Sequence, residues 1–330
     1  MKAIIYEKYG PPEIFQLKEV SKPVPKDDEI LVKIHATTVA AEDPRYRSFN
    51  FPAWGWLPLR LQIGIFKPRQ KILGFYFAGE VVSIGKNVTL FRNGDQVIGN
   101  TPGGGTYAQY VCLSEANAIS KKPDNLTYEE SVAVPNGALT ALLFLRSANI
   151  QNGQKILING ASGTVGTAAV QLAKYFETEV TGVCSTGNME FVRSLGADKV
   201  IDYTREDFTK SSQTYDIIFD VMGWKGFSRS KHLLKENGIY LTTNPGFKVF
   251  GQILWTKMTC GKRVKWVASG LLTKAGDLEY IIRLVEDGQI RPVIDRSYPL
   301  EKMAEAHRYV ETGHKKGDVV ITIAHSEIEV

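Results

Sequence analysis

The chain has 330 residues, of which 43% are hydrophobic and 23% charged, as in an ordinary soluble globular protein large enough for two domains. Its net charge of +5 slightly favours an anionic ligand and is too small to indicate a nucleic-acid-binding protein, so we expect no nucleic-acid partner. No apolar run of about 18 residues is present, so no membrane span is expected.

The first 125 residues are rich in strand signals that Gly and Pro interrupt. The start, MKAIIYEKYGPP, has too short an apolar part for a signal peptide and alternates like a strand. Further alternating or β-branched runs predict strands over 29–36, 78–84 and 96–98. Three widely spaced cysteines (Cys112, Cys184 and Cys260) predict neither a disulfide framework nor a zinc knuckle. We therefore expect a mostly β unit in a cytoplasmic protein.

From about Thr127 the pattern changes to strands that alternate with helices. Thr127 and Glu130 have the spacing of a capping box before an apolar helix. The expected strands are KILING, EVTGVC, KVIDY, YDIIFDVMG and GIYLTTN, and the helices between them are TAAVQLAKYF, NMEFVRSLG and FSRSKHLLKE. This alternation predicts an α/β protein with a doubly wound parallel sheet. The residues after about Val267 are too few to fold alone, so we expect them to rejoin the first domain.

The segment NGASGTVG at 159–166 follows the strand KILI and begins a helix. Ala161, Gly163 and Gly166 stand at the three positions of a GxGxxG motif. In this strand–turn–helix context we expect the turn to bind the pyrophosphate of a dinucleotide at the helix N-terminus, through Ser162, Thr164 and Val165 as well. A tight glycine turn without a ligand is the alternative.

The end of the next strand bears on which dinucleotide is bound. An NAD enzyme usually has an acid about 20 residues after the turn, and residues 183–188 contain none. Ser185 and Thr186 can donate hydrogen bonds to a 2′-phosphate, and Arg193 and Tyr203 are expected nearby. We therefore predict NADPH in preference to NAD. For Arg193, the role of an ordinary exposed helix residue is equally consistent.

Together these segments resemble the zinc-independent quinone oxidoreductase branch of the medium-chain dehydrogenase/reductase superfamily, which includes 2-alkenal reductases and zeta-crystallin. The matching stretches include LGFYFAGEVVSIGKNV, FRNGDQVIG, GGGTYAQYV, NGASGTVGTAAVQLAK and SLGADKVIDY, and they span nearly the whole chain. The resemblance implies a GroES-like mostly β domain (1–125 and 267–330), interrupted by a Rossmann domain (126–266). It also implies an active site in the cleft between them and commonly a homodimer.

The resemblance further implies metal-free chemistry. Aligning Asp43 with the Asp that ends the first zinc segment of the relatives puts Ala40 in the cysteine position, Phe75 in the histidine position and Tyr76 in the acid position. Alanine and phenylalanine cannot bind Zn²⁺. We therefore expect no zinc, and we expect Phe75 or Tyr76 to border the cleft near the nicotinamide.

Further cofactor contacts are implied only by matching positions. They are Thr140, Asp220, Val221, Thr243, Val267 and Lys316. Two departures remove positive charge that the family often has, Gly187 in place of Arg or Lys and Asp318 in place of Lys, and both weaken the prediction of NADPH.

In the same way, a tyrosine that often lines the substrate pocket aligns with Arg45 or Tyr46. Arg45, Tyr46 and Tyr76 are therefore the candidate catalytic residues, with Arg47 beside them as a further possible donor, although a DPRYR run is often just a charged turn. The apolar segment 51–66 is read either as a loop that closes over a hydrophobic substrate or as a dimer or membrane-surface patch.

The expected function is NADPH-dependent hydride transfer to a quinone or to the C=C of an α,β-unsaturated carbonyl, with a small hydrophobic substrate. The alternative is a cofactor-binding, zeta-crystallin-like protein with a structural or RNA-binding role and little turnover.

Overall fold

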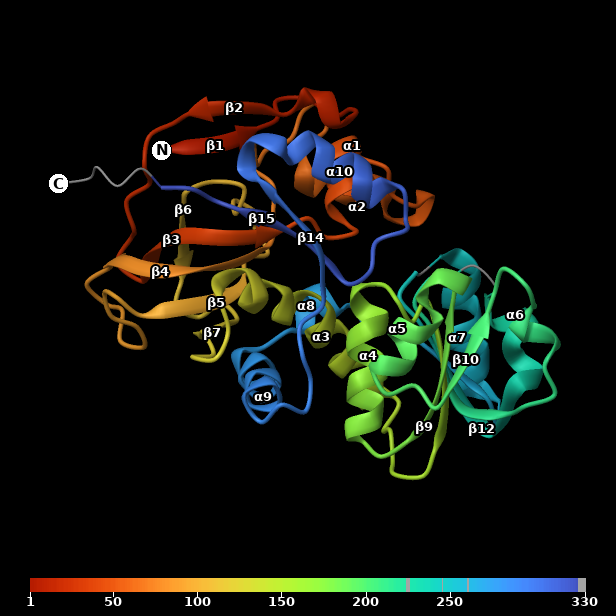
Figure 1. Ribbon diagram of the computed structural model, residues 1–330. Coiled ribbons are helices and arrows are strands. Elements are labelled where there is room, and N and C mark those ends of the chain that lie inside the picture. Colours follow the sequence, from red (N-terminus) through yellow and green to blue (C-terminus); the bar gives the residue numbers. More distant parts are fainter. Residues whose placement is uncertain (224–225, 245, 260, 326–330) are drawn as a thin grey trace. The chain divides into compact units, whose positions relative to one another are not determined.

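The computed structural model describes residues 1–223, 226–244, 246–259 and 261–325 (Figure 1). The chain divides into two compact units. Unit 1 consists of Met1–Asn136 and Thr273–Val330, and unit 2 consists of Gly137–Leu272. The division falls inside helix α3 (Tyr128–Ser147). Among the described residues, no helix is long and apolar enough to cross a membrane.

Unit 1 is built on a seven-stranded sheet of order β14-β15-β3-β4-β5-β7, with β6 also paired to β3. Among the described strands of this sheet, only the β14–β15 pair is parallel. The C-terminal strand β15 pairs with β3, so residues from both ends of the chain complete one sheet. The strands are β3 (Glu29–Thr38), β4 (Tyr76–Ile84), β5 (Gln96–Asn100), β6 (Tyr110–Ser114), β7 (Ile119–Lys121), β14 (Ile294–Pro299) and β15 (Asp318–Thr322), and β1 (Lys2–Ile5) and β2 (Gln16–Glu19) form a separate hairpin.

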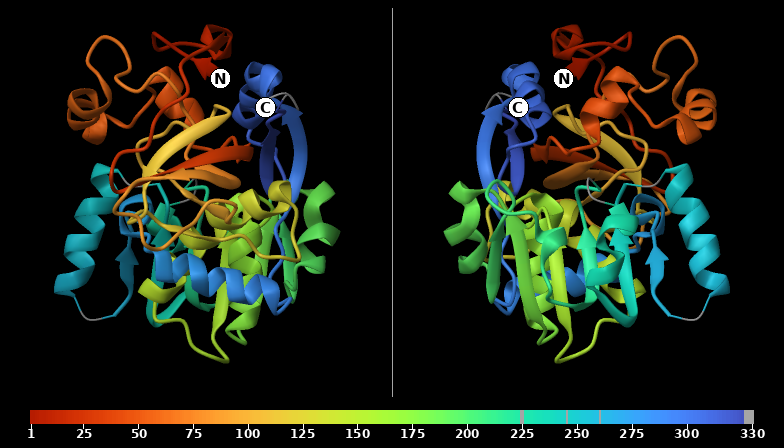
Figure 2. Two further views of the ribbon diagram at one scale, coloured as in Figure 1. Left: turned by 90° about the vertical axis from the view of Figure 1, so that its left-hand side faces the viewer. Right: turned by 90° about the vertical axis from the view of Figure 1, so that its right-hand side faces the viewer.

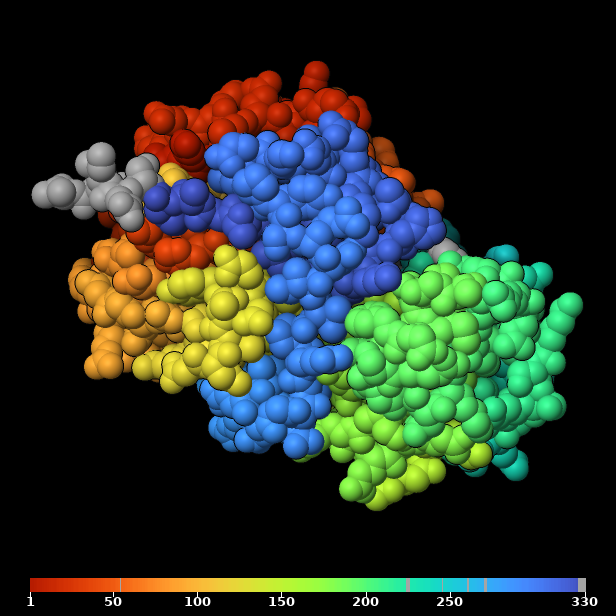
Figure 3. Space-filling model, in the orientation of Figure 1, coloured from red at the N-terminus to blue at the C-terminus, as the bar shows by residue number. Residues whose placement is uncertain are grey.

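Helices and short 3-10 turns lie against this sheet. In Figure 3 the blue residues of α10 (Met303–Glu311) lie directly against the red N-terminal residues, where α10 contacts the 3-10 turn η1 (Pro12–Ile14). The other elements of unit 1 are α1 (Asp43–Ser48), α2 (Ala53–Ile63), α9 (Ala275–Glu286) and η5 (Leu300–Lys302).

The expectation that 51–66 is a loop is wrong, because most of it forms helix α2. The helix begins at the residue after Pro52. It ends at the C-cap residue Gly64, which has a φ of 138°. Trp56, Leu57 and Leu61 remain exposed on this helix.

Unit 2 contains six parallel strands in the order β10-β9-β8-β11-β12-β13 (Figure 2). The sheet begins in its middle, at β8, and grows outward to both edges, which is the doubly wound arrangement. The predicted α/β class is thereby confirmed. The strands are β8 (Lys155–Asn159), β9 (Glu179–Cys184), β10 (Lys199–Asp202), β11 (Tyr215–Asp220), β12 (Leu234–Thr242) and β13 (Arg263–Lys265).

The helices of unit 2 largely follow the sequence pattern. They are α4 (Thr164–Tyr175), α5 (Met189–Ser194), α6 (Gly226–Ser230), α7 (Phe247–Met258) and α8 (Ser269–Leu272), with 3-10 turns η2 (Thr186–Asn188), η3 (Phe208–Lys210) and η4 (Lys231–Leu233). The predicted capping box of α3 is confirmed, because the Thr127 N–H donates to the Glu130 carboxylate (2.9 Å) and the Glu130 N–H donates to the Thr127 hydroxyl (3.2 Å).

One predicted helix of unit 2 is wrong in part. FSRSKHLLKE was expected to be helical throughout, but α6 ends at Ser230 and β12 begins at Leu234. Leu233 and Leu234 are both buried in the core beneath the sheet, and Leu234 pairs with Tyr215 of β11. Pairing with a buried neighbouring strand outweighs local helix propensity here.

Candidate functional site

The turn between β8 and α4 is shaped by glycines. Gly160 has a left-handed φ of 88°. A Cβ on Gly166 would lie 2.0 Å from the Gly160 carbonyl oxygen, and one on Gly137 would lie 2.3 Å from the Thr164 carbonyl oxygen. Helices α4 and α3 therefore approach the turn this closely only because Gly166 and Gly137 lack side chains. The motif puts Ala161 in its first position, but the left-handed residue is its neighbour Gly160.

The N-terminus of α4 is open toward a ligand. Gly163 is the N-cap residue, and among the described residues no side chain caps the helix. A Cβ on Gly163 would be 3.7 Å from its nearest neighbour, so the space beside the backbone is free. Ser162 and Val165 are half-buried here, and Thr164 is buried. Free N–H groups and the helix dipole at such an end favour a phosphate, so the turn fits the pyrophosphate of a dinucleotide.

A hydrogen-bonded bridge joins this turn to the end of β9. The Asn188 side-chain amide donates to the hydroxyls of Ser162 (3.1 Å) and Ser185 (3.3 Å). Two of the predicted cofactor residues, Ser162 and Ser185, are thus brought together by a third that the sequence did not single out. The signal for Asn188 is its position as the first residue of the predicted helix NMEFVRSLG, where it forms the N-cap of α5 and a polar residue is common.

A carboxylate stands beside the end of β9 after all. Strand β10 pairs with β9 so that Asp202 lies opposite Cys184. Thr186 donates its hydroxyl to Asp202, and hydrogen bonds from Thr186 and Thr204 lower the pKa of Asp202, so it is charged at neutral pH. Looking for an acid directly after β9 misses Asp202 because it belongs to the next strand.

The other two residues predicted near the ribose differ in their surroundings. Tyr203 follows β10, and its side chain is 41% exposed. Arg193 is ion-paired with Glu190 one turn earlier on α5, which is the behaviour of an ordinary surface helix residue.

Asp220, at the end of β11, is held inside the sheet. One carboxylate oxygen accepts from the Asn159 side-chain amide and the Gly223 N–H (both 2.8 Å), and the other accepts from the Tyr240 hydroxyl (2.5 Å). The carboxylate is buried and joins the ends of β8, β11 and β12. Through these hydrogen bonds Asp220 holds the loops at this edge of the sheet in position.

The remaining predicted residues of unit 2 lie at two hydrogen bonds. The Thr243 hydroxyl donates to the Val221 carbonyl oxygen (2.7 Å), so the loops after β11 and β12 are joined. The Thr140 hydroxyl, half-buried on α3, donates to the hydroxyl of Ser269 (3.4 Å), two residues beyond half-buried Val267.

In unit 1 the predicted catalytic tyrosines lie close to two acids, half-buried Glu42 and buried Asp43. The Tyr46 ring, on α1, packs on Phe75 with 4.9 Å between ring centroids. Tyr76 begins β4, and its carbonyl oxygen accepts from the Thr37 hydroxyl (2.7 Å). Burial first, and then the charges of Glu42 and Asp43, raise the pKa of both tyrosines. Each phenol therefore stays protonated at neutral pH and can act as a hydrogen-bond donor.

The two arginines of α1 differ from these tyrosines. Arg45 is exposed and lines a hollow of about 350 Å³ together with Ser48, Asn50 and Glu311. Arg47 is buried, and its guanidinium donates to the Glu311 carboxylate (2.6 Å) and to the Gly10 carbonyl oxygen (3.0 Å). Arg47 therefore holds unit 1 together rather than offering a free donor.

The loop before β15 carries two lysines with different surroundings. Lys316 is exposed, and its backbone N–H donates to the Asp295 carboxylate (3.2 Å). Lys315 is half-buried and donates to the Gly317 carbonyl oxygen (2.8 Å), and burial lowers the pKa of its ammonium. Asp318 accepts from the Asn136 side-chain amide (2.6 Å).

The residues that align with the zinc ligands of the relatives make other contacts here. The Ala40 N–H donates to the Asp43 carboxylate (2.6 Å), and Phe75 packs on Tyr46. Within the described part of the chain, no three His, Cys, Asp or Glu side chains are grouped so that they could hold a metal ion. Cys112 and Cys184 are free thiols, and Cys260 lies outside the described residues.

A doubly wound parallel sheet with an open glycine turn, combined with a largely antiparallel second unit, points to the class of dinucleotide-dependent dehydrogenases and reductases. Comparison with known proteins agrees. Residues 26–124 match the family model described as alcohol dehydrogenase GroES-like domain, and residues 195–321 match the one described as zinc-binding dehydrogenase.

Two curated relatives and one solved structure are similar over most of the chain. The chloroplastic quinone-oxidoreductase homolog of Spinacia oleracea is 33% identical, over 97% of this chain and 98% of its own. The NADPH-dependent alkenal/one oxidoreductase of Arabidopsis thaliana is 29% identical, over 97% of this chain and 79% of its own. The quinone oxidoreductase of Coxiella burnetii superposes with a TM-score of 0.87 at 30% identity, over 98% of this chain and 99% of its own.

The chain therefore belongs to the medium-chain dehydrogenase/reductase superfamily, in its quinone oxidoreductase branch, and is an oxidoreductase. The resemblance expected from the sequence motifs is confirmed, as is the combination of a GroES-like domain with a Rossmann-like sheet.

Proposed function

We propose that this protein is an NADPH-dependent reductase that transfers hydride to a quinone or to the C=C of an α,β-unsaturated carbonyl. The observation that carries the proposal is the uncapped N-terminus of α4 behind the Gly160–Gly166 turn, in a chain whose relatives are named for reducing these two substrate classes. Quinones and enones share a conjugated carbonyl, which accepts hydride and spreads the resulting charge to an oxygen.

The residues of unit 2 fit a dinucleotide in three places. The turn from Ala161 to Gly166 would hold the pyrophosphate, and the Val221–Thr243 pair and Thr140 would hold the nicotinamide side. Ser185, Thr186 and Tyr203 would lie around the adenosine ribose and its 2′-phosphate, and Lys316 stays a prediction from the family resemblance. When bound, the cofactor supplies the hydride, and the protein supplies position and polarity.

Tyr46 and Tyr76 are the proposed hydrogen-bond donors to the substrate carbonyl. Because their pKa values lie above the ordinary value for tyrosine, both phenols keep their protons at neutral pH. A neutral phenol stabilises an oxygen as it gains negative charge, and this interaction is stronger in the transition state than in the ground state. Arg45 is the alternative donor, from its exposed position on α1.

The choice of NADPH over NADH rests on a balance of charge. Ser185 and Tyr203 offer hydroxyl donors to a phosphate, whereas the Asp202 carboxylate, bonded to Thr186, repels one. The Thr186 hydroxyl donates its one proton to Asp202 and so does not donate to a phosphate. We propose NADPH because the Ser185 hydroxyl, which accepts from Asn188, and the exposed Tyr203 hydroxyl can each donate to the phosphate.

We also propose a homodimer that forms at the outer edge of the six-stranded sheet. Strand β13 ends the sheet, and its outer edge has no partner among the described strands. Such edges readily pair with another chain. Light scattering on the purified protein would test this assignment, and a monomer at micromolar concentration would contradict it.

Loss of reduced-nicotinamide absorbance tests the reductase proposal. The protein is mixed with NADPH or NADH and a panel of quinones, 2-alkenals and cyclic enones. We expect turnover with NADPH and at least one conjugated acceptor. Tight cofactor binding without turnover of any acceptor would contradict the proposal, and RNA binding by the same preparation would point to the non-enzymatic alternative.

A further inference from the structure

Helix α7 of unit 2 presents an apolar face to solvent. Phe247, Leu254, Trp255 and Met258 lie at helical spacing, and each is exposed, Trp255 by 60% and Met258 by 81%. In Figure 2 this helix, in cyan, stands at the outer edge of the unit 2 sheet beside β13. Soluble proteins rarely leave so many large apolar side chains together on one helix.

The orientation of α7 is fixed by its other face. Val249 and Ile253 pack on the core beneath the sheet, and Phe250 packs edge-on against Trp266 with 5.8 Å between ring centroids. Thr256 is buried, and its hydroxyl accepts from the Val264 N–H of β13 (3.2 Å). These contacts hold the apolar face outward, so its exposure is a property of the folded unit.

The segment of sequence that contains α7 is rich in positive charge. Residues 221–272 contain nine of the chain's 40 Lys and Arg and only one of its 35 Asp and Glu, namely Glu236. The net charge of this segment, +8, exceeds the +5 of the whole chain, so the remaining residues are net acidic. Lys248 and Lys257 are exposed on α7 itself, and the helix contains no acid.

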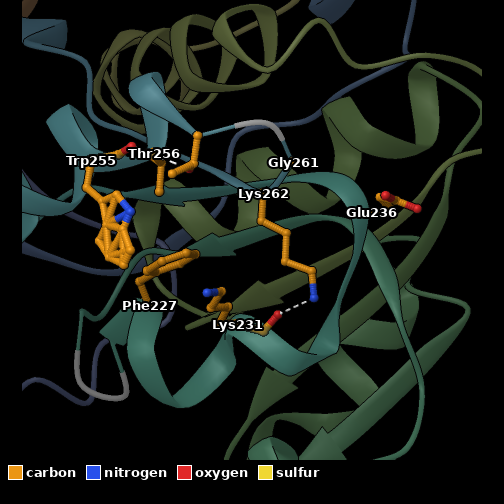
Figure 4. A pocket seen from close by; sticks show the side chains of 8 residues that line it. Phe227, Lys231, Glu236, Trp255, Thr256, Gly261 and Lys262 are labelled. Carbon is orange, nitrogen blue, oxygen red and sulfur yellow. Dashed lines mark hydrogen bonds between the residues drawn. The ribbon is translucent and has the colours of Figure 1, made fainter.

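A hollow beside α7 combines both properties. It has a volume of about 500 Å³ and is lined by Phe227 and Trp255 as well as Lys231 and Lys262. Figure 4 shows the two rings next to each other, with the two lysines further along the hollow and Glu236 at its far end. The Lys262 ammonium donates to the Lys231 carbonyl oxygen (2.9 Å) and has further donor capacity.

We propose that α7 and this hollow form a docking surface for the face of a bilayer that contains anionic phospholipids. The apolar residues of α7 would enter the boundary between headgroups and acyl chains, and the lysines would meet lipid phosphates. The proposed homodimer pairs the edges of β13, next to α7. A two-fold contact that also covered the apolar face of α7 would set Lys248 and Lys257 near the same basic surface of the other copy, where like charges repel.

Sedimentation with vesicles tests the proposal. The full-length protein is mixed with vesicles of phosphatidylcholine alone or with about one-third phosphatidylglycerol, at low and high salt. We expect binding to the anionic vesicles only, weakened by salt because the attraction is screened. No binding to anionic vesicles, or equal binding to both kinds, would overturn the proposal.

Variants separate the two contributions. Lys248→Glu with Lys257→Glu should weaken binding roughly tenfold or more, and Leu254→Ser with Trp255→Ser should do the same without changing the net charge. The matched control is Leu90→Ser, since Leu90 is 65% exposed against 64% for Leu254 but lies beside Glu115. Binding that survives both α7 double variants but is lost with Leu57→Ser and Leu61→Ser would assign the surface to α2 and overturn the proposal.

The same variants exclude a copy–copy interface and misfolding. All the substituted side chains are exposed, so circular dichroism and thermal unfolding should match the unsubstituted protein. Light scattering should show an unchanged oligomeric state. Dissociation of a dimer by the α7 variants with unchanged vesicle binding would show that a second copy covers α7 instead.

Discussion

The Thr186 hydroxyl donates a hydrogen bond to the Asp202 carboxylate, so a negative charge lies next to the residues expected to receive a 2′-phosphate. Asp202 ends β10 and Thr186 follows β9, and these two strands are parallel neighbours in the unit 2 sheet. The charge comes from a strand next to the one where an NAD enzyme usually has its acid. In the proposed cofactor site, Asp202 is the negative charge that opposes a 2′-phosphate.

Asp202→Asn should strengthen NADPH binding roughly fivefold, because one repulsive charge near the phosphate is worth about 1 kcal/mol when partly solvated. NADH, which has no 2′-phosphate, should change little. Fluorescence titration with both cofactors measures the ratio. An unchanged ratio of the two dissociation constants would show that the phosphate lies elsewhere.

Substitutions at Gly166 and Gly163 test two different roles of the turn, the packing of α4 and the approach of a ligand. Gly166→Ala puts a Cβ 2.0 Å from the Gly160 carbonyl oxygen, so we expect the free energy of unfolding to fall by roughly 1–3 kcal/mol and dinucleotide binding to be lost. In Gly163→Ala the new Cβ lies 3.7 Å from its nearest neighbour, so stability should be unchanged. The Cβ should crowd the phosphate and so weaken cofactor binding. Chemical denaturation and cofactor titration on both variants measure the two effects. A Gly163→Ala variant with normal cofactor affinity would show that the ligand does not approach this turn.

The capping box at Thr127 and Glu130 and the succession of parallel strands could be read from the sequence because each depends on near neighbours. Three other features depend on contacts far along the chain. Gly137 matters because α3 meets Thr164, Asp202 matters because of the register of β10 on β9, and Leu234 belongs to a strand because it pairs with Tyr215. For the site, the glycine turn was predictable, whereas the internal hydrogen bonds that occupy Asp220 and Arg47 were not.

Tyr46→Phe should lower kcat by roughly 10- to 100-fold with a conjugated acceptor, because it removes one donor to the developing oxygen charge while keeping the ring on Phe75. Since the pKa of Tyr46 is raised, the rate should not fall between neutral pH and about pH 9 through ionisation of this group. Steady-state kinetics across that range measures both. Tyr298→Phe, another half-buried tyrosine of unit 1, is the control and should retain full activity. Equal kcat in both variants would remove Tyr46 from the mechanism.

His307 should make stability depend on pH. It is fully buried, and the Arg47 guanidinium, which can only donate, lies 3.0 Å from Nδ1, so the ring proton is on Nε2 and faces the Tyr107 hydroxyl at 3.2 Å. Burial, and then the charge of Arg47, holds the pKa of His307 well below its usual value of 6.5. The unfolded chain therefore takes up a proton below pH 6.5 that the native protein does not.

Stability is thus full above the unfolded pKa of about 6.5 and falls as the pH drops below it, by up to about 1.4 kcal/mol per pH unit for this group. Urea unfolding at several pH values between about 7.5 and 5.5 should show the slope. His307→Gln should be less stable at neutral pH and have a flatter pH dependence. His35, whose pKa burial lowers to about 4, contributes with the same sign, so His35→Gln should remove a second part of the slope. If His307→Gln keeps the full slope, the proton is taken up elsewhere, and the buried Arg47–His307–Tyr107 chain does not control acid stability.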